Sequence, residues 1–278
     1  HAASLLPAGD TAARMDAVRN VTNTIRSMGD YISPEGRIGL WPEYGLQANP
    51  WIVAQARLFL DEAKQAGYSV PGKLTKVFDQ QIRGILEDTC LAPIERAMVL
   101  LSMRSMNDSA SMERLSAMTT DGTAKWILAQ AWWRSGRKER AWKEAKSARI
   151  EFVDKRELGG VFRSPLRDAA LVAMAMREIG WKQGYEGLRG TILEALAGTD
   201  WMNTQELSNG LRFLAMNASV PSRLPTKVVD SSVLWNADGR DWRKLMLVGG
   251  TAATDLPYGT SKILLRWKSD SIPLHVNV

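Results

Sequence analysis

The chain has 278 residues, of which 45% are hydrophobic and 24% are charged, and it carries a formal net charge of +6. This length allows one or two domains with a sizeable core, and this composition excludes a wholly disordered chain. No apolar run approaches the roughly 18 residues that a membrane-spanning helix needs.

Cysteine and histidine are scarce: the chain has one cysteine, Cys90, and two histidines, His1 and His275. A single cysteine excludes an intrachain disulfide and a thiolate-rich zinc site, and two distant histidines leave little material for metal or triad chemistry. We therefore expect no cofactor and no metal. The sequence opens on His1, without an apolar stretch behind a basic one, so we treat it as a fragment that shows no signal peptide.

Residues 11–222 read as one helix after another. The first periodic segment, "TAARMDAVRNVTNTIRSMG", stops at Gly29, and the next begins at Pro50 and stops at Gly67. Proline in the first turn and glycine just past the end are typical of helices. Further helices are predicted at about 73–88, 93–106, 110–118, 123–135, 137–148, 165–179, 185–197 and 203–217.

These helices are arranged in pairs. Pairs restart at a spacing of roughly 30–45 residues, which suits an array of αα-hairpins, and the restarts lie near Pro50, Pro93, Thr123, Pro165 and Asn203. The segment "PLRDAALVAMAMREIG" is apolar nearly all round, whereas "RKERAWKEAKSA" is charged on most sides. We therefore expect an inner and an outer layer of helices, with Trp126, Trp132 and Trp133 filling the gaps between them.

The pattern changes near Ser219. The segment "SVPSRLPTK" carries two prolines, and "SKILLRWK" alternates in the manner of a strand, with Ile263 and Leu265 on one face. Residues 236–239 give a turn signal, and apolar residues alternate again from Leu274 to the end. The C-terminal part is therefore predicted to form strands that need a partner sheet.

The candidates for catalysis are weak. Acids occur side by side at Asp61 and Glu62, at Glu87 and Asp88, and as Glu151 and Asp154, but adjacent acids on a helix point in different directions. The sequence has no aspartate-rich cluster and no phosphate-binding glycine loop, and Ser105 and Ser164 lack a base. Cys90 follows a helix, whose C-terminus disfavours a thiolate, so we expect a buried or merely tolerated thiol.

These observations predict a protein that is not an enzyme. The alternative is a helical toroid enzyme that acts on a glycan or an isoprenoid, and it requires acids that converge in the central mouth of the toroid.

Residues 134–149 carry seven basic residues and two acidic ones. They form either a solvated helix face or a docking patch for an anionic partner, made of Arg134, Arg137, Lys138, Arg140 and Lys143. Nucleic acid is not expected as the partner, because no stacking platform or recognised binding motif accompanies the charge.

The stretch "GLWPEYGLQANPWIVAQARLFLDEAKQAGYSVP" resembles the signature region of the thioester-containing domain of bacterial alpha-2-macroglobulin-like proteins. Two later segments, "SPLRDAALVAMAMREIG" and "DWMNTQELSNGLRFLAM", resemble two further helices of that domain, so the resemblance spans most of residues 15–217. The matching positions are Gly39, Trp41, Pro50, Trp51, Phe59, Leu60, Ala63, Gly67, Tyr68, Val70, Pro71, Arg167, Asp168, Trp201 and Gln205.

The resemblance implies a mainly α protein: an α/α toroid of six helical hairpins over residues 1–222, followed over residues 223–278 by β-strands of a flanking, CUB-like domain. It implies an endopeptidase inhibitor, that is a protease trap, or a scaffold module of the periplasm or cell envelope in bacterial defence. The implied partners are proteases, other envelope proteins and other domains of the same parent chain.

Thioester-bearing members of this family carry a Cys-x-Glu-Gln sequence, whose thioester acylates the attacking protease. Here Cys90 is followed by Leu91, Ala92 and Pro93, with no glutamine to close a thioester. Either the motif stands upstream of His1 or the chain is similar to the thioester-less branch. No catalytic residue is carried over from the family.

The Trp-Pro and Pro-Trp steps on either side of the polar loop are predicted to be structural. We expect Trp41 and Trp51 to pack at a hairpin junction, with Pro50 starting an inner helix.

Overall fold

The computed structural model describes residues 11–42, 48–103, 108–157, 161–198, 201–218, 232–237, 243–246 and 263–266. His1, His275, Ser105, the proline-rich segment after Ser219 and the alternation from Leu274 lie outside these residues. Within them the protein is mainly helical, and no helix is long and apolar enough to cross a membrane. The α-helices are α2 (Thr11–Ser27), α3 (Pro50–Gln65), α4 (Gly72–Glu87), α5 (Pro93–Ser102), α6 (Ser109–Met118), α7 (Gly122–Arg134), α8 (Lys138–Ser147), α9 (Pro165–Ile179), α10 (Tyr185–Ala197) and α11 (Thr204–Ala218), and a 3-10 turn, η1, covers Met28–Tyr31.

The helix limits follow the start and stop signals of the sequence. Asn49 caps α3, because its side-chain oxygen accepts a hydrogen bond from the Ile52 amide at 2.9 Å. Proline occupies the first turn of α3, α5 and α9. Gly180 ends α9 in the left-handed conformation, with φ of 81°, which glycine adopts without strain. The predicted helices are confirmed to within a few residues.

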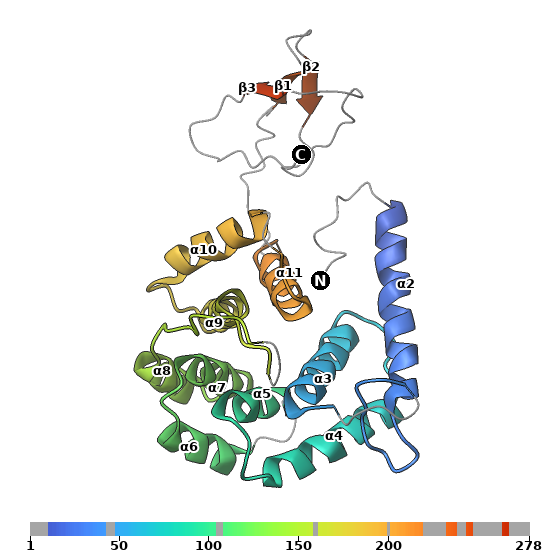
Figure 1. Ribbon diagram of the computed structural model, residues 1–278, viewed down its shortest axis with the longest axis vertical. Coiled ribbons are helices and arrows are strands. Elements are labelled where there is room, and N and C mark those ends of the chain that lie inside the picture. Colours follow the sequence, from blue (N-terminus) through green and yellow to red (C-terminus); the bar gives the residue numbers. More distant parts are fainter. Residues whose placement is uncertain are drawn as a thin grey trace.

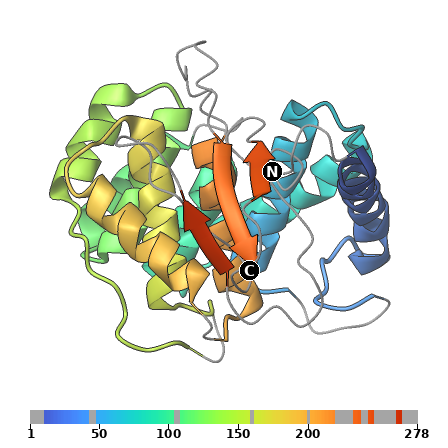
Figure 2. The ribbon, with the colours of Figure 1, turned by 90° about the horizontal axis from the view of Figure 1, so that it is seen from above.

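The helices form two layers (Figures 1 and 2). The inner helices α3, α5, α7, α9 and α11 pack against one another in that order, and α4, α6, α8 and α10 each follow an inner helix and pack on it from outside. Helix α2 lies at the edge of the array in both views. The predicted succession of helical hairpins is therefore confirmed.

The two helices singled out in the sequence occupy the predicted layers. In α9 the side chains from Arg167 to Met176 are all buried, whereas α8 buries only Ala141, Glu144 and Ala145. Trp126 and Trp132 are fully buried between the layers, and Trp133 packs on the core from its margin. The large aromatic side chains therefore fill the space between hairpins, as close packing requires.

Side chains join the first inner helix to the last. Trp51 of α3 donates its indole N–H to Gln205 Oε1 of α11 at 3.2 Å, and Arg212 of α11 binds Glu62 of α3 at 2.6 Å and Gln55 at 3.3 Å. These contacts link residues that lie some 150 positions apart in the chain. The arrangement is consistent with the predicted helical toroid.

Three short strands follow: β1 (Ser232–Ala237), β2 (Arg243–Met246) and β3 (Ile263–Arg266). They form an antiparallel sheet in the order β2-β1-β3, with Val233 opposite Leu245 and Trp235 opposite Leu265. Asn236, which we predicted to begin a turn, lies within β1, because it pairs with Leu264 across the sheet. The assignment of this segment to a flanking β-domain stays a prediction.

One glycine allows two backbones to meet. A Cβ on Gly122, at the start of α7, would lie 2.4 Å from the carbonyl oxygen of Arg149, which is a backbone atom that cannot swing away. We expect Gly122→Ala to lower the free energy of unfolding by about 1–3 kcal/mol in urea titrations, as overpacking does. The matched control is Gly84→Ala in α4, where nothing lies within 4 Å. There, alanine should stabilise the helix by about 0.5–1 kcal/mol, so equal effects at the two positions would contradict this account.

Candidate functional site

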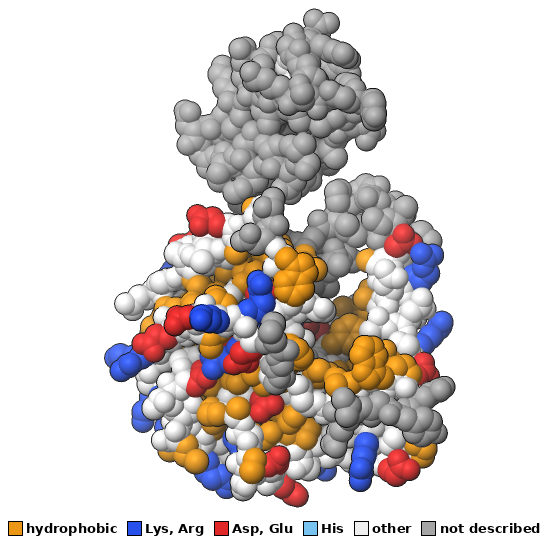
Figure 3. Space-filling view, in the orientation of Figure 1, with side chains coloured by type: hydrophobic (Ala, Val, Ile, Leu, Met, Phe, Trp, Pro, Cys, Tyr) orange, Lys and Arg blue, Asp and Glu red, His pale blue; other side chains and the backbone are white. Residues whose placement is uncertain are grey.

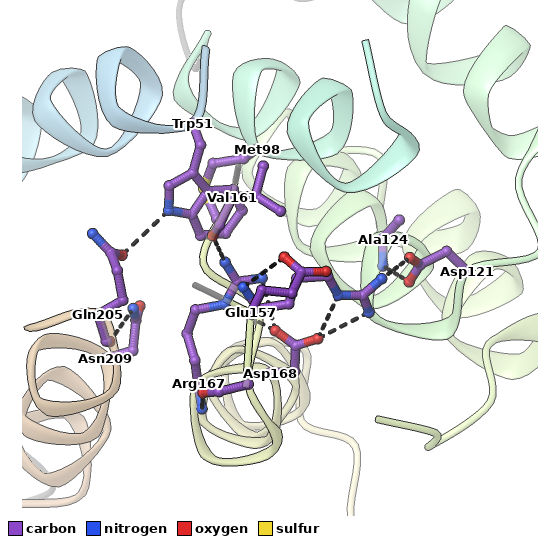
Figure 4. A network of polar contacts seen from close by, with 12 residues as sticks. Trp51, Met98, Asp121, Ala124, Glu157, Val161, Arg167, Asp168, Gln205 and Asn209 are labelled. Atoms are coloured by element: carbon purple, nitrogen blue, oxygen red, sulfur yellow. Dashed lines mark hydrogen bonds and ion pairs between the residues drawn. The ribbon is translucent and has the colours of Figure 1, made fainter. Parts of the chain in front are cut away.

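The N-terminal ends of the inner helices α3, α7, α9 and α11 meet at one side of the helical array, and charged side chains are buried between them (Figure 4). The caps of these helices fix the geometry. Ser164 accepts a hydrogen bond from the Arg167 amide at 3.2 Å, and Asp121 accepts one from the Ala124 amide at 3.0 Å. Each cap satisfies a backbone amide of the first turn and so fixes the residue at which the helix begins.

Arg167 lies at this centre. Its side chain is fully buried, and its guanidinium carbon stands 4.2 Å from the centroid of the Trp51 ring, which is itself fully buried. The Nε of Arg167 donates to Asp168 Oδ1 at 2.9 Å. Its Nη2 lies 2.7 Å from the same oxygen without hydrogen-bond geometry, and its Nη1 donates to the carbonyl of Val161. Burial lowers the pKa of Arg167 below its ordinary value, against the opposing effect of Asp168.

Asp168 is shared between two arginines. Its second oxygen accepts from Arg163 Nε at 2.9 Å, and Arg163 in turn donates to Asp121 Oδ2 at 2.7 Å. Burial alone would lower the pKa of Arg163, but the charges of Asp168 and Asp121 outweigh burial and raise it. Two arginines and two aspartates therefore form a network of ion pairs that ties α7, α9 and the segment before α9 together.

A second acid stabilises the start of α11. Glu206 and Asn203 exchange hydrogen bonds between side chain and backbone, at 2.8 and 2.9 Å, in a reciprocal cap. Glu206 also accepts from Arg156 Nε at 2.9 Å, and the guanidinium of Arg156 lies 5.3 Å from the ring centroid of Trp201. Burial raises the pKa of Glu206, but the hydrogen bonds from Arg156 and from the Asn203 amide prevail and hold it below 4.5.

The lowered pKa of Glu206 predicts a loss of stability in acid. Since its folded value lies below the ordinary 4.5, ionised Glu206 stabilises the fold above pH 4.5, and this contribution disappears as the pH falls through the folded value. We expect the difference in free energy of unfolding between the wild type and Glu206→Gln to shrink as the pH falls below 4.5. Urea titrations at a series of pH values measure it, and a difference that stays constant with pH would contradict the assignment.

The structure brings together four of the signature residues: Trp51, Arg167, Asp168 and Gln205. Other signature residues lie in connections or at the margin of the core. Gly39 donates its amide to the Tyr31 carbonyl at 2.8 Å, and Gly67 ends α3 with φ of 89°. Phe59 and Tyr68 pack on the core from its margin, and Pro71 precedes α4.

Two signature tryptophans are exposed. Trp41 is 67% exposed and Trp201 is 70% exposed, so the prediction that Trp41 packs at a hairpin junction is wrong, whereas Trp51 is buried as predicted. Trp51 lies on the buried face of α3 with Ala54 and Leu58, whereas Trp41 lies in the loop before the helix. Sequence reasoning missed Arg163, Asp121, Arg156 and Glu206. The spacing of Asn203 and Glu206, which is that of a reciprocal helix cap, could have pointed to one of them.

The opposite halves of the inner helices enclose a cavity of about 160 Å³. All five inner helices contribute to its lining, which combines apolar and charged side chains. Its acids are held by arginines: Glu62 binds Arg212 at 2.6 Å, and Glu178 beside the cavity binds Arg134 through two hydrogen bonds of 2.7 Å. Burial lowers the pKa of Arg134, but Glu178 and, further off, Glu62 and Asp61 outweigh it and raise that pKa. Each of these two carboxylates therefore neutralises a cation.

The predicted anionic docking patch is only partly formed. Arg134 points inward to Glu178, so its place in the patch was wrongly predicted, because α7 carries Gln130 and Arg134 one turn apart on its inner side. Arg140 pairs with Glu113 of α6. Arg137, Lys138 and Lys143 are exposed on or next to α8.

Cys90 lies in the connection between α4 and α5. Its amide donates to Asp88 Oδ1 at 2.8 Å. Its side chain is exposed, so the expectation of a buried thiol is wrong. Among the residues that the structure describes, no group of three histidine, cysteine or acidic side chains is placed to hold a metal ion.

The described residues form an array of helical hairpins, and this fold can be compared with solved structures. No family model and no curated protein matches the sequence. The chain is similar to native alpha-2-macroglobulin from Escherichia coli, in a structure spanning domain MG7 to the C-terminus, with a TM-score of 0.65 and 19% identity over 87% of this chain and 39% of that one.

Two further structures agree. Trypsin-activated alpha-2-macroglobulin from Escherichia coli gives a TM-score of 0.62 and 17% identity over 95% of this chain and 18% of that one. Salmonella alpha-2-macroglobulin reacted with methylamine gives a TM-score of 0.59 and 20% identity over 86% of this chain and 15% of that one. The predicted resemblance to bacterial alpha-2-macroglobulins is thus confirmed at the level of the fold, and the chain spans well under half the length of these proteins.

Proposed function

We propose that residues 1–222 form a thioester-domain-like toroid of an alpha-2-macroglobulin-like protein, and that residues 223–278 belong to its flanking β-domain. The module restrains attacking proteases, or assembles with other envelope proteins, and carries out no chemistry of its own. The observation that supports this most is the likeness of fold, which covers 84–95% of the chain in bacterial alpha-2-macroglobulins. We place the parent protein in the periplasm or at the cell envelope on the same ground.

The buried charges support a structural role for the toroid. At the helix N-termini, Asp168 lies between Arg163 and Arg167, and at the cavity Glu62 and Glu178 each bind an arginine. A glycoside hydrolase needs one carboxyl group that can give a proton and a second that can attack or activate water. Carboxylates that bind guanidinium groups in this way are committed to those partners.

Cys90 itself does not carry the thioester motif of the family. Cys90 is the single cysteine of the sequence, it lies exposed in an outer connection, and Leu91, Ala92 and Pro93 follow it. We propose the thioester-less form, in which the protein restrains proteases by enclosure and contact instead of by acylation; a thioester motif upstream of His1 is the alternative.

The test uses the full-length polypeptide that carries this chain, incubated with trypsin or elastase. If the protein encloses a protease, cleavage of a large protein substrate falls while cleavage of a small chromogenic peptide continues, since only the large substrate is excluded. Methylamine, which reacts with thioesters, should change neither the mass of the protein nor the inhibition. Unchanged cleavage of both substrates would contradict protease restraint, and a mass gain with methylamine would contradict the thioester-less form.

A further inference from the structure

A basic and aromatic surface surrounds the outer helix α8. Its exposed cations are Arg137, Lys138, Lys143 and Lys146, and Lys182 joins them from the turn between α9 and α10. Figure 3 shows basic side chains, with acidic ones among them, on the left edge of the molecule, where α8 lies in Figure 1. We call these five residues, together with Trp142 and Trp181, the α8 surface.

The acids near the α8 surface leave most of its charge uncompensated. Of the two glutamates on α8, Glu144 is buried, where it accepts a hydrogen bond from Ser116 and lies 4.0 Å from Lys125. Glu113 of α6 pairs with Arg140, which is not part of the surface. Glu139 is thus the acid that shares the exposed side of α8 with the surface cations. The α8 surface therefore presents a local positive field.

Aromatic side chains hold several cations in place. The guanidinium of Arg137 lies 5.5 Å from the centroid of the Trp132 ring, and the ammonium of Lys138 lies 5.1 Å from that of Trp133. Trp132 is fully buried, so Arg137 lies against a rigid base. Cations that are already positioned lose less conformational entropy when they bind an anion.

Trp142 gives the surface an apolar part. Its side chain is 44% exposed and packs on Trp181 with the two rings tilted and their centroids 5.1 Å apart. Trp181 in turn makes an edge contact with buried Trp126, at 5.7 Å between centroids. Ile150 is also 44% exposed and lies next to the turn between α9 and α10. Its Cδ1 would be 3.2 Å from a Cβ placed on Gly184 of that turn. An exposed indole on a firm aromatic base, flanked by lysines, combines apolar surface and positive charge in one place.

We propose that the α8 surface docks on the anionic headgroups of a lipid bilayer. Exposed tryptophans are stable at the headgroup level, and the long side chains of lysine reach phosphate groups from beside them. Helix α8 belongs to the outer layer and lies at the edge of the array, so it is accessible to a broad planar partner, such as a bilayer. A single nucleic-acid strand would instead be held in a groove. A cluster of four or more basic residues is the usual size of an anionic-lipid site.

The test measures binding of the full-length polypeptide to phosphatidylcholine vesicles with and without phosphatidylglycerol, by flotation at low and high salt. The variant Lys138→Glu/Lys143→Glu/Lys146→Glu should lower the partition coefficient on phosphatidylglycerol vesicles by about 100-fold, since each cation near such a surface contributes several-fold. The control Lys64→Glu/Lys73→Glu/Lys76→Glu makes the same change of charge at exposed positions on α3 and α4 and should leave binding within about threefold of the wild type. Equal losses in both variants would overturn the proposal, because net charge alone would then explain binding.

The tryptophan separates a bilayer from a soluble polyanion. Trp142→Ala should weaken vesicle binding without changing its salt dependence, whereas Trp201→Ala, at a more exposed tryptophan elsewhere, should not weaken it. Circular dichroism and thermal melting establish that every variant is folded. Binding to heparin or polyphosphate with no dependence on Trp142, and no binding to anionic vesicles, would assign the α8 surface to an acidic macromolecule and overturn the bilayer proposal.

Discussion

Asp168→Asn should lower the free energy of unfolding by about 3–5 kcal/mol, because it leaves a buried cation without its partner. Asp168 is fully buried and binds both Arg163 and Arg167, and Arg167 has no access to solvent. The substitution keeps the shape of the side chain and removes the charge, so the loss reports electrostatics and not a cavity. Urea unfolding followed by far-UV circular dichroism measures it.

Two companion variants sharpen this result. Asp16→Asn breaks the ion pair between Asp16 and Arg19 on the exposed face of α2 and should cost no more than about 1 kcal/mol. The double variant Arg167→Met/Asp168→Asn removes the buried cation together with its partner and should be more stable than Asp168→Asn alone. A loss in Asp168→Asn as small as that in Asp16→Asn would contradict the buried network.

Trp51→Ala should cost about 3–5 kcal/mol, as large buried aromatic side chains do. Trp51 is fully buried under Arg167 and bonded to Gln205, so its removal opens a cavity where α3, α9 and α11 meet. Trp51→Phe should cost less, since it keeps most of the apolar volume and loses the hydrogen bond. The same urea titration measures each variant.

The matched control is Trp41→Ala. Trp41 belongs to the same sequence signature but is 67% exposed, so its removal should change the free energy of unfolding by no more than about 0.5 kcal/mol. Equal costs at Trp41 and Trp51 would restore the original prediction that both residues pack at a junction.

The helices were predictable because the chain marks their ends locally. Pro50 and Pro165 start inner helices, and Gly67 and Gly180 end them, so the limits of these helices can be predicted without information from distant residues. The layers were predictable too, since a helix that is apolar all round has no face for solvent.

The site was predictable only in part. Trp41 and Trp51 are the same residue type in one motif, yet one is exposed and the other buried. Trp51 is buried because it lies on the same face of α3 as Ala54 and Leu58, whereas Trp41 precedes the helix. Arg163 has no such pattern: it lies in the segment before α9, and its two partners are brought to it by the packing of α7 on α9. Ion pairs between helices depend on tertiary geometry, which no local spacing encodes.

The contacts between α3 and α11 bear on how this protein is made. In a linear helical repeat each unit touches only its neighbours, so early units can fold while later ones are still being synthesised. Here the partners of Trp51 and Glu62 are Gln205 and Arg212, which leave the ribosome some 150 residues later, so these contacts cannot form until then. Helix α3 therefore emerges with Trp51 still exposed to solvent, although this side chain is buried in the folded protein. We expect the nascent chain to need chaperone protection until α11 has emerged.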